Sequence, residues 1–149
     1  MKHFISRRNF LKAVGVTAAA SAMAAAVPQA SAGFLTGKDA AVTILYTNDV
    51  HTYIDNKSPK LTYAAIAAMK QGYVDEGKPV LLVDAGDHIQ GTAYGSMDNG
   101  ATIIELMNEA GYDIATLGNH EFDYGMARTK AIIKEADFPY VSCNWVDLR

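Results

Sequence analysis

Polar side chains of the kinds that bind metal ions follow three apolar runs of the sequence. Asp49 and His51 come soon after VTILYT, Asp87 follows VLLVD, and Asn119 follows IATLG. Because Asp49 and His51 are two residues apart, an extended backbone would point them to the same side. Mixed oxygen and imidazole ligands are typical of manganese, zinc or iron sites rather than of magnesium or calcium sites.

An imidazole and a carboxylate follow Asn119 within the stretch GNHEFD, as His120 and Asp123. A carboxylate that holds an imidazole fixes its tautomer and stabilises its cation, which suits acid–base or charge-stabilising chemistry. Each cluster alone also fits a plainer interpretation, because an Asp at a strand end is often a turn or capping residue. The coincidence of three clusters favours a site, since converging acids are costly unless a cation lies among them.

These clusters need elements that bring them together, and the sequence predicts alternating strands and helices. β-branched and apolar runs predict strands, and amphipathic stretches with capping residues predict helices. The predicted strands are 42–47, 79–86, 113–118 and 139–144, and the predicted helices are 58–77, 101–111 and 126–136. Such alternation implies a largely parallel sheet in an α/β fold. The carboxyl ends of parallel strands share one edge, so the three clusters are expected to converge there.

Two local features are predicted in more detail. The helix over 58–77 is expected to be capped by Ser58, with Pro59 in its first position. Its apolar face is expected to contain Leu61, Ala64, Ala65, Ala68 and Met69. The single cysteine, Cys143, is expected to be a small buried side chain in the last strand. One cysteine permits neither an intrachain disulfide nor a zinc site built on cysteines.

The composition bounds the possible functions. With 149 residues, half of them hydrophobic, the chain can form one packed domain at most. All four charged side chains in residues 1–32 are basic, so the remainder has nine basic against 16 acidic side chains, a net charge of about −7. This sign argues against a protein that binds duplex nucleic acid, and no basic run in the remainder supports binding to a membrane surface.

Residues 1–32 have the organisation of an export signal. A basic stretch, SRRNFLK, precedes a short, alanine-rich apolar stretch and a small-residue cleavage site at Ala32–Gly33. Arg7 and Arg8 resemble the pair of a twin-arginine signal, so the twin-arginine export machinery is the expected partner and the periplasm or cell envelope the expected location. An ordinary secretory signal and an uncleaved anchor are the alternatives, although a stable membrane anchor needs roughly 20 apolar residues. Residues 33–41 are expected to be a linker.

The motifs TNDVH, GDHIQG and GNHEFD resemble the first three signature motifs of the calcineurin-like metallophosphoesterases. The longer strings ILYTNDVH, DAGDHIQGT and LGNHEFDYG are similar to the branch that contains periplasmic 5′-nucleotidases, UDP-sugar hydrolases and 2′,3′-cyclic-nucleotide phosphodiesterases. The resemblance extends from Val42 to Asn144. It implies that residues 42–149 form the first half of a metallophosphatase-type α/β sandwich, in β-α-β-α-β-α-β order with mostly parallel strands.

The resemblance also implies two divalent metal ions, manganese, zinc or similar. Asp49 and His51 would hold the first ion, Asp87 would bridge both ions, and Asn119 would bind the second. The implied reaction is hydrolysis of nucleotide phosphoesters, by in-line attack of a metal-bound hydroxide on phosphorus. No covalent phospho-enzyme would be formed.

Further roles are implied for the residues around the metals. His120 would face the substrate phosphate, to stabilise developing charge or protonate the leaving oxygen, and Asp123 would orient it. Glu121 and Phe122 would be supporting or packing residues. His88, next to the bridging acid, is expected to support the site rather than bind metal.

The sequence departs from the family pattern because it contains only four histidines, one of them in the signal. The second metal site is therefore expected to be incomplete, and residues 42–149 to be the N-terminal part of a metallophosphatase domain. An inactive fragment of such an enzyme, or an exported α/β protein that binds metal or solute, is the alternative. His120 and Asp123, which bind no metal in this scheme, favour an enzyme.

Overall fold

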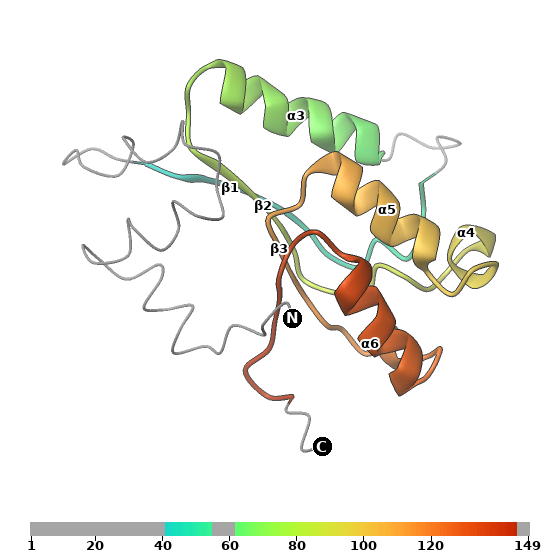
Figure 1. Cartoon of the computed structure of the whole chain (residues 1–149). Coiled ribbons are helices and arrows are strands. Elements are labelled where there is room, and N and C mark those ends of the chain that lie inside the picture. The colour runs from blue at the N-terminus through green and yellow to red at the C-terminus, as the bar shows by residue number, and fades with distance from the viewer. Residues whose placement is uncertain (1–40, 55–61, 146–149) are drawn as a thin grey trace.

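The structure is a computed structural model, and it describes residues 41–54 and 62–145 (Figure 1). The predicted signal, residues 1–32, lies outside the described residues, as does the predicted linker except for its last residue. The predicted caps of the first helix, Ser58 and Pro59, also lie outside them.

Four strands form one parallel sheet with the order β1-β2-β3-β4. Their bounds are β1 (Thr43–Thr47), β2 (Val80–Asp84), β3 (Ile114–Thr116) and β4 (Tyr140–Val141). The register aligns Thr47 with Asp84, Asp84 with Ala115, and Ala115 with Tyr140, so these four side chains share one face. The predicted parallel α/β arrangement is confirmed, although each strand is shorter than expected.

The helices α3, α5 and α6 lie in a row along one face of the sheet (Figure 1). Strands that follow one another in order, with crossovers of one hand, place their helices on the same face. The bounds are α3 (Tyr63–Asp75), α4 (Ala93–Ser96), α5 (Ala101–Ala110), the 3₁₀ helix η2 (His120–Phe122) and α6 (Met126–Glu135). The elements α4 and η2 were not predicted, since three or four residues are too few to show a helical period.

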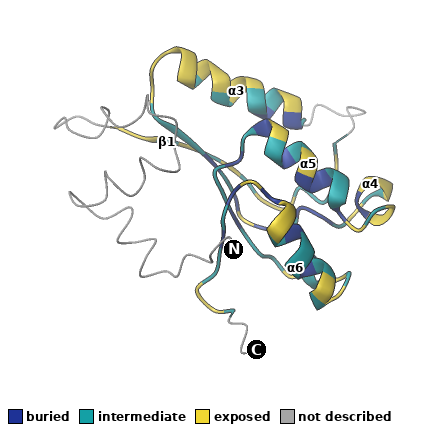
Figure 2. Ribbon diagram, in the orientation of Figure 1, coloured by how far each residue is buried: buried dark blue, intermediate teal, exposed yellow. Residues whose placement is uncertain are grey.

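The core lies between these helices and the sheet. Leu82 and Ala115 are fully buried on the strands, and Ile103, Met107 and Ile132 are fully buried on the helices that cover them (Figure 2). The helix α5 contributes most because its apolar residues recur at helical spacing. As predicted, α5 ends at a glycine, Gly111, which closes it in the left-handed conformation.

The predicted apolar face of the first helix is wrong. Tyr63 and Ile66 are the buried residues of α3, whereas Met69 is 45% exposed. Tyr63 and Ile66 are three positions apart and therefore lie on one face of the helix. Burying these larger side chains removes more apolar surface from water than burying alanines does, so they determine which face packs against the core. The cap observed at the start of α3 is Thr62, whose hydroxyl accepts the backbone N–H of Ala65 at 3.2 Å.

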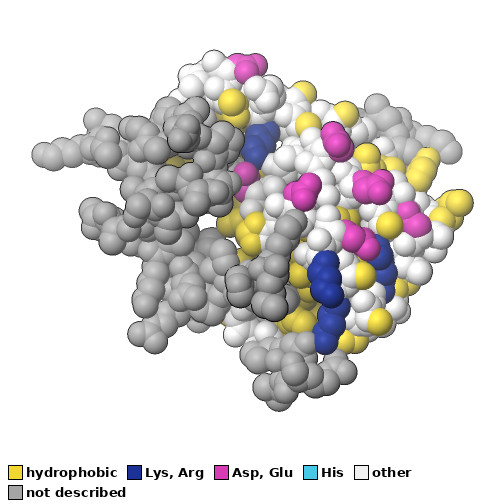
Figure 3. Space-filling view, viewed as in Figure 1, with side chains coloured by type: hydrophobic (Ala, Val, Ile, Leu, Met, Phe, Trp, Pro, Cys, Tyr) yellow, Lys and Arg dark blue, Asp and Glu magenta, His cyan; other side chains and the backbone are white. Residues whose placement is uncertain are grey.

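The expectation for Cys143 is also wrong, because β4 ends at Val141 and the cysteine beyond it is exposed. None of the helices within residues 41–54 and 62–145 is long and apolar enough to cross a membrane. In the view of Figure 3, acidic side chains are spread over the surface and the few basic ones lie mainly over α6. One of these, Arg128, forms a two-point ion pair with Glu135 at 2.7 Å.

Candidate metal and catalytic site

The loops after β1 and β2 have an unusual backbone at the predicted metal ligands. Asp49, His51 and Asp87 have φ values of 52°, 47° and 59°. Left-handed backbone is uncommon for residues other than glycine, and it gathers at functional sites where the surrounding structure maintains it. The extended backbone assumed for Asp49 and His51 is therefore wrong, yet the side chains stay close, with His51 Nε2 at 3.9 Å from Asp49 Oδ1.

Backbone hydrogen bonds between the two loops hold this conformation. The N–H of Asp49 donates to the carbonyl of Gly86 at 3.2 Å, and the N–H of His51 donates to the carbonyl of Asp87 at 3.0 Å. Beyond them, the N–H of Thr92 donates to the hydroxyl of the buried Thr52 at 2.7 Å. The parallel pairing of β1 and β2 thus continues past the ends of both strands.

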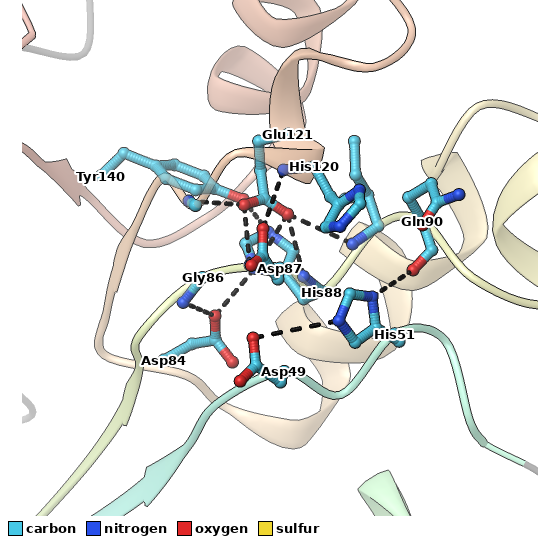
Figure 4. Close-up of polar contacts among 12 residues, drawn as sticks. Asp49, His51, Asp84, Gly86, Asp87, His88, Gln90, His120, Glu121 and Tyr140 are labelled. Carbon is cyan, nitrogen blue, oxygen red and sulfur yellow. Dashed lines mark hydrogen bonds and ion pairs between the residues drawn. The ribbon is translucent and has the colours of Figure 1, made fainter.

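The imidazole of His51 is oriented for metal binding (Figure 4). Its Nδ1 lies 3.0 Å from the carbonyl oxygen of Gln90. A carbonyl only accepts, so Nδ1 donates this hydrogen bond, and in a neutral imidazole Nε2 then has the lone pair. A ring held through one nitrogen by a backbone carbonyl, with the other nitrogen available, is the usual arrangement of a histidine that binds metal.

Three metal-capable side chains meet at this edge of the sheet. His51, Asp87 and His120 each offer a ligand atom, and these atoms lie within 4.8 Å of one another. The rings of His51 and His120 meet edge to face, with centroids 5.0 Å apart. Asp49 lies beside this group through its contact with His51. Asn119 is exposed just before η2, and its assignment as a ligand stays a prediction.

His120 also has the carboxylate partner expected from the resemblance. Its Nδ1 lies 2.7 Å from Asp123 Oδ2. Residues three apart align along a 3₁₀ helix, so η2 brings the two side chains together. The hydrogen bond to Asp123 raises the pKa of His120, and the negative charges of Asp123, Asp87 and Glu121 add to that effect against partial desolvation. The catalytic role of this pair stays a prediction.

Two glycines let the loop of Asp87 touch the loop that follows β3. A methyl group on Gly118 would lie 2.3 Å from Asp87 Oδ1 and 2.7 Å from its backbone nitrogen. On the other side, Gly86 has a φ of 105°, and a methyl group there would lie 2.5 Å from the nitrogen of Gly118. The two loops therefore approach each other at backbone distance, which side chains at these positions would prevent.

A buried polar network lies beneath the site, and sequence reasoning missed most of it. Asp84, His88 and Glu121 are all buried. His88 Nδ1 lies 2.8 Å from Asp84 Oδ1, and its Nε2 lies 2.8 Å from the hydroxyl of Tyr140. Burial alone would lower the pKa of His88, but the hydrogen bond to Asp84 and the charges of Glu121, Asp84 and Asp87 outweigh burial and raise it. Both ring nitrogens of His88 thus contact buried protein groups, and its supporting role stays a prediction.

A hollow of about 470 Å³ adjoins the site on the side of β1. Its wall includes Asp49 and Asn48 from the loop after β1, and the aromatic rings of Tyr46 and Tyr53. Tyr46 is 74% exposed. The hollow leaves one side of Asp49 open to a ligand.

The comparisons with known proteins identify the family of the chain. The family described as calcineurin-like phosphoesterase matches residues 42–149. The chain belongs to this family, whose members are metal-dependent phosphohydrolases. The residues present suit a divalent ion, because His51, Asp87 and Asp49 combine imidazole and carboxylate donors with an oriented ring.

Several of the similar proteins are 5′-nucleotidases. The chain is 40% identical to the snake venom 5′-nucleotidase of Gloydius brevicauda in an alignment 114 positions long, which covers 69% of this chain and 19% of that protein. It is 37% identical to the 5′-nucleotidase of Homo sapiens over 69% of this chain and 20% of that protein. The solved structure of a 5′-nucleotidase precursor from Thermus thermophilus is 31% identical with a TM-score of 0.62, over 68% of this chain and 22% of that one. The chain thus spans about a fifth of the length of the curated relatives it matches.

Proposed function

We propose that this chain is the metal-binding part of an exported, 5′-nucleotidase-like phosphohydrolase that acts on nucleotide phosphoesters. The proposed ligands of two divalent ions, manganese, zinc or similar, are Asp49, His51, Asp87 and Asn119. The observation that carries the proposal is the meeting of two of these ligands, His51 and Asp87, with the imidazole of His120, since the polar atoms of all three side chains lie within 4.8 Å of one another. The likeness to 5′-nucleotidases supports the substrate class.

The ions would lower the pKa of a bound water and neutralise charge on the phosphoryl oxygens. The protein residues hold the geometry in which this happens. His51 places Nε2 on the side of Asp49, because its Nδ1–H donates to the backbone carbonyl of Gln90. Asp87 is held at one oxygen by the backbone N–H of His120, which fixes its carboxylate between the two halves of the site.

His120 is proposed to act on the substrate phosphate. Asp123 keeps a proton on Nδ1 and stabilises the charged ring, so Nε2–H can donate to a phosphoryl oxygen or to the leaving oxygen. The raised pKa of His120 favours this protonated form.

The decisive experiment compares two variants of the whole protein. Asp87→Asn removes a charge that both ions need, so metal stoichiometry and hydrolysis of AMP should fall together. His120→Asn should lower turnover by roughly 10²-fold or more with little change in metal content. Glu105→Gln, an exposed change on α5, is the control and should alter neither.

Elemental analysis and phosphate release at saturating manganese or zinc measure both effects. Unchanged turnover in His120→Asn would contradict the proposed chemistry. Loss of metal in the same variant would instead make His120 a ligand.

Export is proposed from the sequence of residues 1–32 alone. Arg7 and Arg8 are read as a pair by the export receptor, so replacing both by lysine should retain the precursor in the cytoplasm. Fractionation and immunoblotting measure the distribution. Normal export of the double variant would contradict a twin-arginine signal.

A further inference from the structure

The carboxylate of Glu121 is fully buried between the two loops that carry the site. Its Oε2 accepts the backbone N–H groups of Asp87 at 2.8 Å and of Gly118 at 2.6 Å. Its Oε1 accepts those of His88 at 2.9 Å and of Ile89 at 3.3 Å. One side chain thus connects the loop after β2 with the loop after β3 (Figure 4).

This arrangement suits an ionised carboxylate. An ionised carboxylate only accepts hydrogen bonds, and here both oxygens accept two each. The left-handed backbone of Asp87 turns three successive N–H groups toward one point, which makes a concave anion-binding surface. A buried acid without such donors would be strongly destabilising, so the loop and Glu121 depend on each other.

The backbone of Glu121 is itself fixed from the opposite side. Its carbonyl accepts the hydroxyl of the fully buried Thr129 on α6 at 2.7 Å. Glu121 lies in η2 directly after His120, and the two side chains point to different sides of that turn: His120 toward Asp123 and the site, Glu121 into the core. A shift of Glu121 would therefore move His120 and Asp87 together.

We infer that Glu121 is a positioning residue, whose carboxylate sets the distance between Asp87 and His120. The inference rests on the proposed function, because it concerns how the two residues are placed for metal binding and turnover. Glu121 acts through the backbone of its neighbours, because its fully buried carboxylate contacts their N–H groups. Its removal should therefore impair metal affinity and turnover together, beyond what a loss of stability explains.

Glu121→Gln tests the inference in the whole protein. The nitrogen of a glutamine amide does not accept hydrogen bonds. In either orientation of the side chain, the NH₂ group therefore faces two backbone N–H groups and leaves both without an acceptor. We expect the dissociation constant for manganese to rise roughly 10–100-fold, as for other residues that orient metal ligands, and turnover of AMP to fall. Titration calorimetry at a temperature where the variant is folded, as checked by circular dichroism, measures the affinity.

Met107→Ala is the matched control, because it also destabilises the protein but lies in the core on α5, outside both loops. Its manganese affinity should stay within about twofold of the wild type, since affinity is measured on folded protein only. Equal affinity in wild type and Glu121→Gln would overturn the inference while leaving the proposed function intact. A wild-type protein that binds no manganese would overturn both.

Hydrogen exchange keeps the inference testable if Glu121→Gln does not fold. In the wild type, the amides of Asp87, His88, Ile89 and Gly118 should exchange their hydrogens at least about 100-fold more slowly than exposed amides do. Each oxygen of Glu121 holds two of these amides, so both must be released together before they exchange. Glu121→Asp keeps the charge but is one methylene shorter, so these amides should lose protection while those of Ile103 and Ile104 on α5 keep it. Unprotected amides at the four positions in the wild type would overturn the inference.

Discussion

The backbone N–H of His120 donates to Oδ1 of Asp87 at 2.8 Å, across 33 positions of the chain. This bond connects the carboxylate proposed to bridge two metal ions with the imidazole proposed to act on the phosphate. The contact is possible only because the loops after β2 and β3 touch at Gly86 and Gly118. The close approach of the two loops, which the buried carboxylate of Glu121 also connects, therefore defines the geometry of the site.

Gly118→Ala should disrupt this approach. The new methyl group would lie 2.3 Å from Asp87 Oδ1 and 2.7 Å from the Asp87 nitrogen, so the loop must move. Overpacking of this kind typically lowers the free energy of unfolding by about 1–3 kcal/mol. Urea denaturation measures this loss, and manganese affinity should weaken in parallel because Asp87 is displaced.

Gly72→Ala is the matched control for that change. Gly72 lies within α3, and no atom lies within 4 Å of the position of a methyl group there. Alanine loses less backbone entropy than glycine in a helix, so the free energy of unfolding should rise by about 0.5–1 kcal/mol. If both glycine variants shifted stability in the same direction, the steric account of Gly118 would be contradicted.

The sheet could be predicted from the sequence because its signals are local. Runs such as VTILYT and VLLVD are apolar and β-branched, and turn residues follow them, so the alternating order and the parallel pairing could be inferred. The convergence of His51 and Asp87 was predicted for the same reason, since the ends of neighbouring parallel strands meet at one edge.

The remaining features depend on tertiary contacts. The left-handed backbone of Asp49 and Asp87 is maintained by hydrogen bonds between loops, which no pattern of neighbouring residues reveals. Glu121 occurs beside His120 in a polar stretch, so nothing local indicates that it is buried under four N–H groups. The buried face of α3 was missed because Tyr63 and Ile66, rather than the alanines, meet the core.

Asp98 should make the stability of α5 dependent on pH. Its Oδ2 accepts the N–H of Thr102 at 2.9 Å, and its Oδ1 accepts the N–H of Gly100 at 3.1 Å. Partial desolvation acts to raise the pKa of Asp98, but the hydrogen bonds from Thr102, Ala101 and Gly100 outweigh it and lower the pKa. Because the folded pKa is depressed, this stabilisation is present above the ordinary pKa of about 3.9 and is lost as the pH falls through the folded value.

Asp98→Ala should therefore lower the free energy of unfolding by about 1 kcal/mol near neutral pH, the usual net contribution of an intramolecular hydrogen bond. The difference from the wild type should shrink below about pH 4, where the carboxylate takes up a proton. Urea denaturation at neutral and acidic pH measures it, with the exposed change Glu109→Ala as the control. A difference that stayed constant across this range would assign the effect of Asp98 to packing rather than to charge.

Two buried tyrosines should respond oppositely to the same substitution. Among the described residues, the hydroxyl of Tyr63 is the one buried side-chain polar atom without a hydrogen-bond partner. The hydroxyl of Tyr140 instead lies 2.8 Å from His88 Nε2, in the network under the site. Removing an unsatisfied buried hydroxyl relieves its desolvation cost, whereas removing a partner leaves the other buried group unsatisfied.

Tyr63→Phe should thus raise the free energy of unfolding by up to about 1 kcal/mol, and Tyr140→Phe should lower it by about 1–2 kcal/mol. Both changes delete one oxygen from a side chain that is at least nine-tenths buried. A difference in buried apolar area therefore cannot explain opposite changes in the free energy of unfolding. Urea denaturation of the two variants beside the wild type gives the signs directly. A loss of stability in Tyr63→Phe equal to that in Tyr140→Phe would mean that the Tyr63 hydroxyl has a partner in solution and that burial alone does not distinguish the two sites.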